Sequence, residues 1–185
     1  MKIICVVGMP SSGKTIVSDK AKQLGIFTLT FDDIVREEMQ IKGIIYTKNN
    51  KRKMSEWFYK NHKEMMRRII DKITQSNNSD KIVIEGLISP KQIQDLKDRL
   101  NQEELSILAI HSSPKIRFER RNQNIDYYML DYKNIKESDN IGIKMGLSEV
   151  IAMADHMIIN DGDLLEFRET VKHKLIELLN IDVKR

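Results

Sequence analysis

Near the amino terminus the sequence reads Gly8-Met9-Pro10-Ser11-Ser12-Gly13-Lys14-Thr15, which matches the pattern G-x-x-x-x-G-K-[ST] at every position. The apolar run Lys2–Val7 precedes this stretch and the amphipathic run Lys14–Leu24 follows it. A strand, a glycine-containing loop and a helix in this order place successive backbone amides around an anion, at the positive end of the helix. The sequence therefore predicts a loop that binds the phosphates of a nucleoside triphosphate.

Residues within this loop have separate expected roles. Gly8 and Gly13 allow backbone conformations and close approaches that a side chain would block. We expect Lys14 to reach the β- and γ-phosphates of ATP as a catalytic residue, and the Thr15 hydroxyl to ligate Mg²⁺. The intervening positions are expected to bind the nucleotide through their backbone: Met9, Pro10, Ser11 and Ser12. ATP and Mg²⁺ are thus the expected substrate and cofactor.

Outside the loop, short apolar runs alternate with amphipathic ones, as they do in βα units around a parallel sheet. Besides Lys2–Val7, the runs that predict buried strands are Ile26–Phe31, Lys81–Glu85, Leu105–His111 and His156–Asn160. Helices are expected after each of them, and Leu164–Leu179 has the apolar spacing of a closing helix. With 185 residues, the sequence predicts a single α/β domain.

Composition narrows the possible function classes. Hydrophobic residues make up 41% and charged residues 31%, and the formal net charge is +4. Cys5 is the single cysteine, so an intrachain disulfide framework and a cysteine-based zinc site are excluded; we expect this thiol to be buried and inert. No apolar run approaches the roughly 18 residues that span a membrane, and no signal-peptide core is present. We therefore expect a cytoplasmic protein.

Two segments depart from the simple alternation. Residues 42–72 contain ten Lys or Arg and three acidic residues, which gives this segment +7 and the rest of the chain −3. Residues 117–146 are polar and contain tyrosines. In a small kinase, which moves a phosphoryl group from ATP to an acceptor molecule, such segments bind the acceptor and cover the site. We therefore expect an acceptor-binding insertion at about 32–76 and a lid at about 117–146. The basic segment is expected to form one amphipathic helix that packs its apolar side on the core and collects an anionic acceptor, with these residues on the apolar side: Met54, Trp57, Phe58, Met65 and Ile69.

Carboxylates follow two of the predicted strands. Asp32 and Asp33 come after the second strand, where they can act as a base or metal-shell carboxylate, or simply stabilise the first turn of a helix. Glu85 ends the third strand, at the sheet edge where open α/β folds bind ligands. A cluster of cations follows Pro114, and it either forms a solvated helix face or closes over the transferred phosphoryl group: Arg117, Arg120 and Arg121.

Several classes of phosphate-loop protein are excluded. An N-K-x-D guanine motif is absent from the sequence, and 185 residues cannot hold the extension of a motor or large ATPase. The remaining layout is that of a small kinase. Leu24-Gly25-Ile26 with Phe31–Arg36 resembles the second strand and acceptor helix of dephospho-CoA kinases, and Asp33–Arg36 resembles the D-x-x-R step of adenylate kinases. Ala154–Gly162 is similar to the A-D-x-x-I-x-N segment of dephospho-CoA kinases, and Gly146–Asp155 resembles a signature of an archaeal family of adenylate-kinase-like P-loop proteins.

This resemblance implies a three-layer P-loop NTPase fold with a five-stranded parallel sheet in the order 2-3-1-4-5. It implies transfer of the γ-phosphoryl group from ATP·Mg²⁺ to a small, nucleotide-like acceptor. By motif match Asp32 is the catalytic acceptor-side carboxylate and Arg120 is the catalytic lid residue. The resemblance also gives binding residues: Asp33 and Arg36 for the acceptor, Glu85 for the acceptor and the metal shell, and Asn160 and Asp161 for the nucleotide near adenine.

Two departures from the related pattern bear on the acceptor. Ile88 and Ser138 stand where those families usually have arginine. A hydroxyl acceptor benefits from a nearby base, whereas a nucleoside monophosphate attacks with an ionised oxygen and needs cations instead. The sequence thus favours a hydroxyl acceptor like that of dephospho-CoA, with a nucleoside monophosphate next. The latter would need replacement charge, for which the candidates are Lys60, Arg67 and Arg68.

Two alternatives stay open. The chain could be an ATP-binding sensor with weak ATPase activity, or a nucleic-acid-dependent ATPase, since aromatic residues among cations can stack on bases. The helical spacing of the aromatic residues favours core packing, so nucleic acid is not an expected partner. A membrane is not an expected partner either, and nothing in the sequence predicts the oligomeric state.

Overall fold

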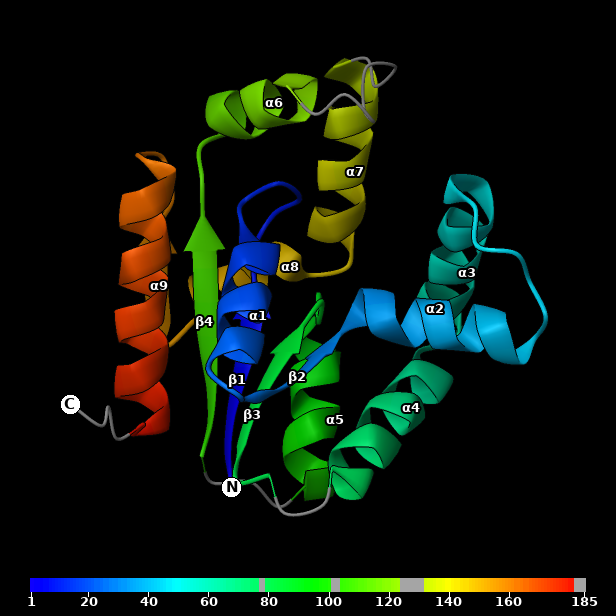
Figure 1. Cartoon of the computed structure of the whole chain (residues 1–185). Helices are drawn as coiled ribbons and strands as arrows, with labels where there is room; N and C mark the ends of the chain where they lie inside the picture. Colours follow the sequence, from blue (N-terminus) through cyan, green and yellow to red (C-terminus); the bar gives the residue numbers. More distant parts are fainter. Residues whose placement is uncertain (77–78, 101–103, 124–131, 182–185) are drawn as a thin grey trace.

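The computed structural model describes residues 1–76, 79–100, 104–123 and 132–181, and of residues 122–123 and 132–135 it describes the backbone alone. One parallel sheet has the strand order β2-β3-β1-β4-β5 (Figure 1), which confirms the predicted fold class and order. The strands are β1 (Lys2–Val7), β2 (Phe27–Thr30), β3 (Lys81–Glu85), β4 (Leu105–His111) and β5 (His156–Ile159). The expected second and fifth strands were too long, because Phe31 begins a helix and Asn160 begins a loop.

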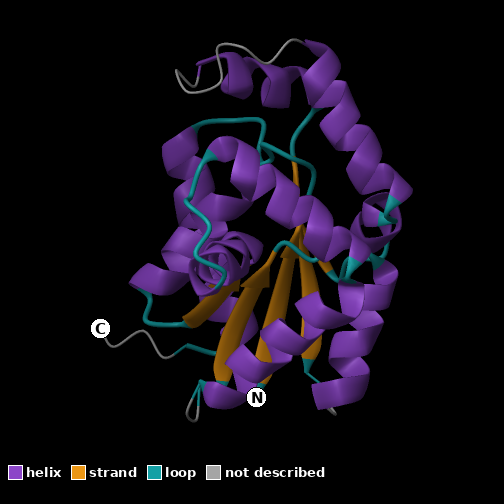
Figure 2. Cartoon of the chain, turned by 90° about the vertical axis from the view of Figure 1, so that its right-hand side faces the viewer, coloured by secondary structure: helices purple, strands orange, loops and turns teal. Residues whose placement is uncertain are grey.

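Alternation of side chains along β1 assigns each face of the sheet to its own core. Ile3 and Cys5 belong to one cluster of buried residues, whereas Ile4 and Val6 belong to the other. Helices therefore cover both faces, as Figure 2 shows. The second cluster contains residues of α1 (Lys14–Gln23) and α9 (Leu164–Leu179). The first contains residues of α2 (Phe31–Ile41), α3 (Lys48–Lys60), α4 (His62–Gln75), α5 (Pro90–Leu100) and α8 (Leu147–Ala152).

Two further helices, α6 (Pro114–Gln123) and α7 (Tyr132–Lys144), lie above the carboxyl ends of the strands (Figure 1). They belong to the segment predicted as a lid; residues 124–131 of that segment lie outside the described residues. Among the helices of the described ranges, none combines the length and apolar character that crossing a membrane requires. Cys5 is a free cysteine with no exposed surface, as expected.

The prediction of one long helix in the basic segment was wrong. The helix is interrupted at Asn61, between α3 and α4, where the backbone has φ −108° and ψ 55°. The Asn61 side-chain amide donates to the Trp57 carbonyl oxygen at 2.8 Å, which occupies an acceptor at the end of α3. Phe58 and Met65 on either side of the break are both fully buried, so core packing of the apolar residues holds even though the helix is divided.

Cations of the basic segment pair mostly with carboxylates instead of collecting in one patch. Arg68 Nη2 lies 2.7 Å from Glu38 Oε2, and Lys72 Nζ lies 2.7 Å from Glu37 Oε2. Arg67 pairs with two carboxylates of its own helix, Glu64 and Asp71. Because Glu37 and Glu38 belong to α2, these ion pairs connect α4 to α2.

Candidate active site

The phosphate loop takes backbone conformations at Gly8 and Gly13 that leave no room for a side chain. Gly8 has φ 153° and Gly13 has φ 106°. A Cβ atom on Gly8 would lie 2.4 Å from the Ile110 carbonyl oxygen, and one on Gly13 would lie 2.3 Å from Asn160 Nδ2. A side chain at either position would therefore clash with its neighbours. Ser11 is also left-handed, with φ 64°, which is uncommon outside glycine.

Lys14 is the first residue of α1 and reaches back over the loop. Its Nζ donates to the Met9 carbonyl oxygen at 3.1 Å. Burial lowers the pKa of Lys14; the carboxylate of Glu85 opposes this shift, and the positive charges of Arg117 and Arg121 add to it. The ammonium group thus lies at the centre of several charges, next to backbone amides that suit phosphate.

A cavity of about 610 Å³ opens beside the loop, at the carboxyl ends of β1 and β3. Besides Gly8 and Pro10 of the loop, its lining brings together predicted site residues from distant parts of the sequence: Lys14, Thr15, Asp32 and Glu85. Helices α3 and α7 complete the wall with these side chains: Lys51, Ser55, Tyr59, Ser138 and Ile141. Asp33 and Ile88 also line it, whereas Arg36, Arg120, Asn160 and Asp161 are not part of its lining.

Glu85 is held toward α1 by one hydrogen bond. The hydroxyl of Ser18, a residue 1% exposed, donates to Glu85 Oε2. Glu85 and Thr15 both line the cavity, and hydroxyl and carboxylate oxygens are ligands that Mg²⁺ accepts. The described residues gather no cluster of three or more His, Cys, Asp or Glu that could hold a metal by themselves. This donor set fits Mg²⁺, which binds through one or two protein oxygens and completes its shell with phosphates and water.

Asp32 and Asp33, adjacent in sequence, do different things. Asp33 caps α2: its Oδ2 accepts from the Thr30 hydroxyl at 2.7 Å and from the Thr30 amide at 3.2 Å. Asp32 instead faces the insertion, where it pairs with Lys51 and accepts from the Tyr46 hydroxyl at 3.4 Å. Both residues line the cavity, but the helix-end interpretation describes Asp33, whereas Asp32 contacts side chains of the insertion.

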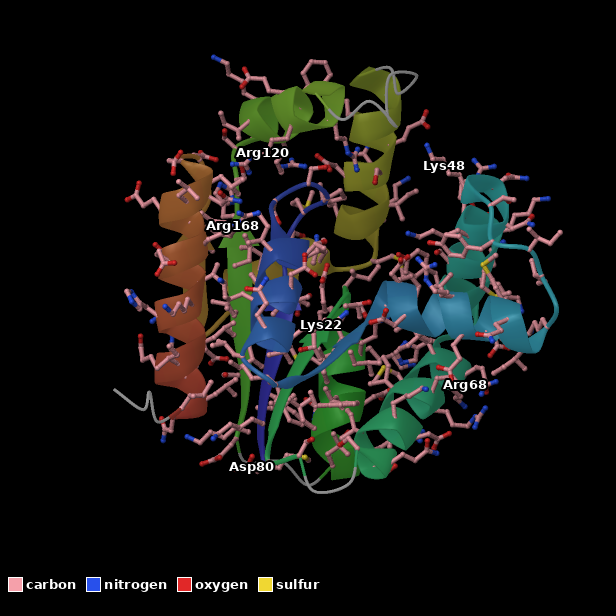
Figure 3. The ribbon with its side chains drawn as sticks, in the orientation of Figure 1. Lys22, Lys48, Arg68, Asp80, Arg120 and Arg168 are labelled. Atoms are coloured by element: carbon pink, nitrogen blue, oxygen red, sulfur yellow. The ribbon has the colours of Figure 1, made fainter. Side chains whose placement is uncertain are left out.

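The arginines of α6 divide into two groups. Arg117, 4% exposed, donates to the Pro10 carbonyl oxygen at 3.1 Å and forms two hydrogen bonds with Asp139 at 2.9 and 2.8 Å. Arg121 Nε donates to Ser11 Oγ at 2.9 Å. Arg120 points elsewhere and donates to the carbonyl oxygen of Asn160 at 2.8 Å (Figure 3). The predicted lid arginine is thus not the one that the fold brings to the phosphate loop.

Asn160 and Asp161 lie on the other side of the loop. Asn160, 2% exposed, donates through Nδ2 to the Ser12 carbonyl oxygen at 2.8 Å and so ties the loop to β5. Hydrogen bonds from the Ser113 amide and the Ser112 hydroxyl, each 2.8 Å long, hold the pKa of Asp161 below its usual value. Both residues line a separate, smaller cavity of about 170 Å³ with residues from the start of α9.

Lys51 is the functional candidate that sequence reasoning missed. The charge proposed as a replacement for Ile88 and Ser138 was assigned to Lys60, Arg67 or Arg68, but none of these lines the cavity. A signal for Lys51 exists in the sequence: Lys51, Ser55 and Tyr59 recur every four residues and so share one helix face. This face lies next to the apolar face of the helix. Because the segment contains many other lysines, the sequence alone does not single out Lys51.

Comparison with known proteins agrees with this geometry. A sequence profile described as an AAA domain matches residues 7–137. The structure of TT1252 from Thermus thermophilus has a TM-score of 0.64 at 16% identity and covers 96% of this chain and 97% of that one. Shikimate kinase from Acinetobacter baumannii has a TM-score of 0.59 at 15% identity, covering 100% and 96% of the two chains. For dephospho-CoA kinase from Campylobacter jejuni the TM-score is 0.57 at 15% identity, with 96% and 97% covered. The protein thus has the fold of the P-loop kinases.

Sequence relatives narrow the assignment further. A UPF0200 protein of Thermococcus gammatolerans is 32% identical over 190 residues, which cover 96% of this chain and 97% of the relative. A UPF0200 protein of Methanococcus vannielii is 34% identical over 192 residues, which cover 98% and 100%. This chain belongs to the UPF0200 family of archaeal proteins, as the resemblance of its closing segments predicted.

Proposed function

We propose that this protein is an ATP-dependent kinase that transfers the γ-phosphoryl group to a hydroxyl of a small, nucleotide-like acceptor. The observation that carries the proposal is one cavity of about 610 Å³ that is lined by both Lys14 of the phosphate loop and Asp32. Its two ends differ chemically, with backbone amides and a lysine at one and a carboxylate at the other. Such a pair of ends suits an anionic donor and a hydroxyl acceptor.

At the donor end, each residue has one task. Lys14 would exchange the Met9 carbonyl oxygen for the β- and γ-phosphates of ATP. Thr15 and Glu85 would hold Mg²⁺, Glu85 through water or directly, with Ser18 fixing the carboxylate. When bound, Mg²⁺ neutralises charge that develops on the phosphates. Arg117 and Arg121 keep the loop in place from α6, and we propose them as the lid residues nearest the phosphates in place of Arg120.

At the acceptor end, Asp32 would take the proton of the attacking hydroxyl. The bond between the acceptor oxygen and the γ-phosphorus forms while the bond between that phosphorus and the bridging oxygen of ADP breaks. The hydroxyl proton passes to the Asp32 carboxylate and then to solvent. Phosphorylated acceptor and ADP are the products.

The lining of the cavity favours a hydroxyl acceptor over a nucleoside monophosphate. Four carboxylates line it (Asp19, Asp32, Asp33 and Glu85) against three lysines (Lys14, Lys22 and Lys51), and arginine is absent from its described lining. An attacking phosphate oxygen needs cations and no base, so this balance suits attack by a hydroxyl better. A hydroxyl like that of dephospho-CoA is the first candidate, and a nucleoside monophosphate is the second.

Specific contacts favour one of two alternative functions and disfavour the other. A sensor with weak ATPase activity is favoured by the pairing of Lys14 with Met9 and of Asp32 with Lys51, since both reactive groups are engaged within the protein. A nucleic-acid-dependent ATPase is disfavoured because the cations of α4 pair with carboxylates. Such an ATPase would be stimulated by RNA or DNA, and this stimulation would fade with added salt.

The test is an acceptor panel (dephospho-CoA, each nucleoside monophosphate, and none), with the mass of every product measured after incubation with ATP and Mg²⁺. A kinase forms ADP only with a particular acceptor, and the product of that reaction is heavier by one phosphoryl group. Equal slow hydrolysis with every acceptor would favour the sensor instead.

The variant Asp32→Asn refines this test. It should lower turnover by about 10² to 10⁴-fold and leave ATP affinity unchanged, because a general base contributes this much to the rate. The matched control is Asp80→Asn, since Asp80 is exposed and lies at the opposite end of β3 (Figure 3). Near-normal turnover in Asp32→Asn would rule out the base.

A further inference from the structure

Asp32 contacts a donor of the insertion through each of its oxygens. Lys51 Nζ pairs with Oδ1, while the Tyr46 hydroxyl and Arg36 Nη2 lie 3.4 and 3.7 Å from Oδ2. Burial lowers the pKa of Lys51, but the hydrogen bond and the charge of Asp32 outweigh this effect, and the pKa is raised overall. Lys51 is therefore protonated at neutral pH. The Asp32 oxygen that contacts Lys51 is therefore occupied by an ammonium group in the free protein.

Lys51 lies on a helix, α3, whose adjacent face is packed in the core. Met54 and Phe58 of α3 are 7% and 0% exposed, so they anchor the helix in the core. On the neighbouring face Lys51, Ser55 and Tyr59 all line the cavity. Lys51 is itself about 41% exposed at the side chain, so its ammonium group can move while the helix stays in place.

We propose that Lys51 detects the negative charge of the acceptor and uncovers Asp32 only when that acceptor is bound. This inference rests on the proposed function. In the free protein Lys51 neutralises Asp32; an acceptor that carries a phosphate group beside its hydroxyl offers the ammonium a second anion. Lys51 turns to that anion, and Asp32 keeps only the two longer contacts to Tyr46 and Arg36. The carboxylate is then able to take the hydroxyl proton.

Such an exchange prevents a wasteful reaction. With ATP bound and Asp32 free, water could attack the γ-phosphorus: its proton would pass to Asp32, the bond to ADP would break, and phosphate would be released. Pairing with Lys51 suppresses the base while no acceptor is present. Lys51 thereby determines both which acceptor is used, through its charge, and when the base becomes active.

The experiment measures ADP formation from ATP and Mg²⁺ without any acceptor. Four proteins are compared: wild type, Lys51→Met, Lys53→Met, and the double variant Asp32→Asn/Lys51→Met. Lys53 is exposed on the same helix and does not line the cavity. Its replacement therefore removes the same charge from α3 without changing the cavity. We expect Lys51→Met to raise the acceptor-free rate about tenfold or more, because a base is released. Lys53→Met should match wild type, and the double variant should lose the gain.

The outcomes separate this inference from the proposed function. Binding of a fluorescent ATP analogue is measured first for each protein. If wild type does not bind it, the proposed function fails together with the inference. If every protein binds it and Lys51→Met hydrolyses ATP no faster than wild type, the inference alone is overturned. Should Lys51→Met fail to fold, Lys51→Gln replaces it with the same expectation, while Lys51→Arg should keep the low rate because it retains the charge.

Discussion

The two walls of the cavity are held in place by different interactions. The nucleotide wall, defined as residues 8–15, is shaped by backbone conformation and by hydrogen bonds to main-chain oxygens, such as that of Asn160 to Ser12. The acceptor wall, defined as α3 with the first turn of α2, is held by packing and by charge, as in the pairing of Lys51 with Asp32. The first wall is formed by consecutive residues that distant side chains hold at their backbone. The second wall depends on contacts between the side chains of two different helices.

This difference explains which parts of the site can vary. A side chain on Gly8 or Gly13 meets atoms at 2.4 and 2.3 Å, so the nucleotide wall tolerates little change. Exposed or half-exposed ion pairs contribute little stability and can be exchanged one by one. We therefore expect substitutions in the acceptor wall to change specificity without loss of the fold, and substitutions in the nucleotide wall to have larger effects.

The largest effect is expected at the nucleotide wall. Lys14→Ala should reduce turnover by about 10³-fold or more, equivalent to about 4 kcal/mol, since it removes the positive charge beside the transferred phosphoryl group. Steady-state ADP release measures this loss, and thermal unfolding should change little. Lys20→Ala, a variant of the same helix outside the cavity lining, is the control. Turnover of Lys14→Ala within tenfold of wild type would contradict the assigned role.

A smaller effect is expected where α7 meets the nucleotide wall. Asp139→Ala leaves Arg117, 4% exposed, without its carboxylate partner. An unpaired buried charge costs about 3 to 5 kcal/mol; we expect about 3 because Asp139 is 17% exposed. Urea unfolding measures this change. Arg117 also donates to the Pro10 carbonyl oxygen, so ATP affinity should fall as well. A loss of stability below 1 kcal/mol would mean that water replaces the carboxylate.

On the acceptor side, two neighbouring arginines test whether charge joins the helices. Arg68→Met removes the 2.7 Å partner of Glu38, which is 5% exposed, and should lower the free energy of unfolding by about 2 kcal/mol. Arg67→Met removes exposed ion pairs with Glu64 and Asp71 of its own helix and should stay within about 0.5 kcal/mol of wild type. Urea unfolding of both variants gives the comparison. Equal effects would show that the pairing with α2 does not stabilise the fold.

The smallest effect concerns pH and the sheet beneath the nucleotide wall. Burial raises the pKa of the Cys5 thiol to about 12, whereas an unfolded thiol has a pKa of about 8.5. The folded state keeps a proton that the unfolded state releases, so this contribution is complete below about pH 8.5 and is lost as pH rises. Between pH 8 and pH 9.5 wild type should lose about 1 kcal/mol more than Cys5→Ala does. Parallel pH profiles of the two proteins would contradict the burial.

Local patterns predicted the sheet and the residues of the loop that line the cavity. The apolar runs gave five strands in the right places, and one motif gave Lys14 and Thr15, because these features depend on adjacent residues. Glu85 followed from its place at the end of a strand, since parallel strands present their carboxyl ends at one edge. The family resemblance supplied the strand order.

Long-range features were not predictable in the same way. The break at Asn61 came from packing two apolar faces on one core, and apolar spacing alone does not distinguish one helix from two. The partner of Asp32 lies nineteen positions away on another helix, and sequence spacing does not choose among many lysines. For the arginines of α6, the helical spacing in the sequence already separates Arg120 from the other two. Arg117 and Arg121 share a face at i and i+4, and that face meets the loop.

The most direct test of the account is calorimetric titration of the folded protein with ATP in the presence of Mg²⁺. The account predicts saturable binding of one ATP per chain that weakens when Mg²⁺ is removed and weakens further in Lys14→Ala. Folded wild-type protein that binds neither ATP nor GTP with Mg²⁺ would contradict it, because every proposed step begins with a triphosphate in the phosphate loop.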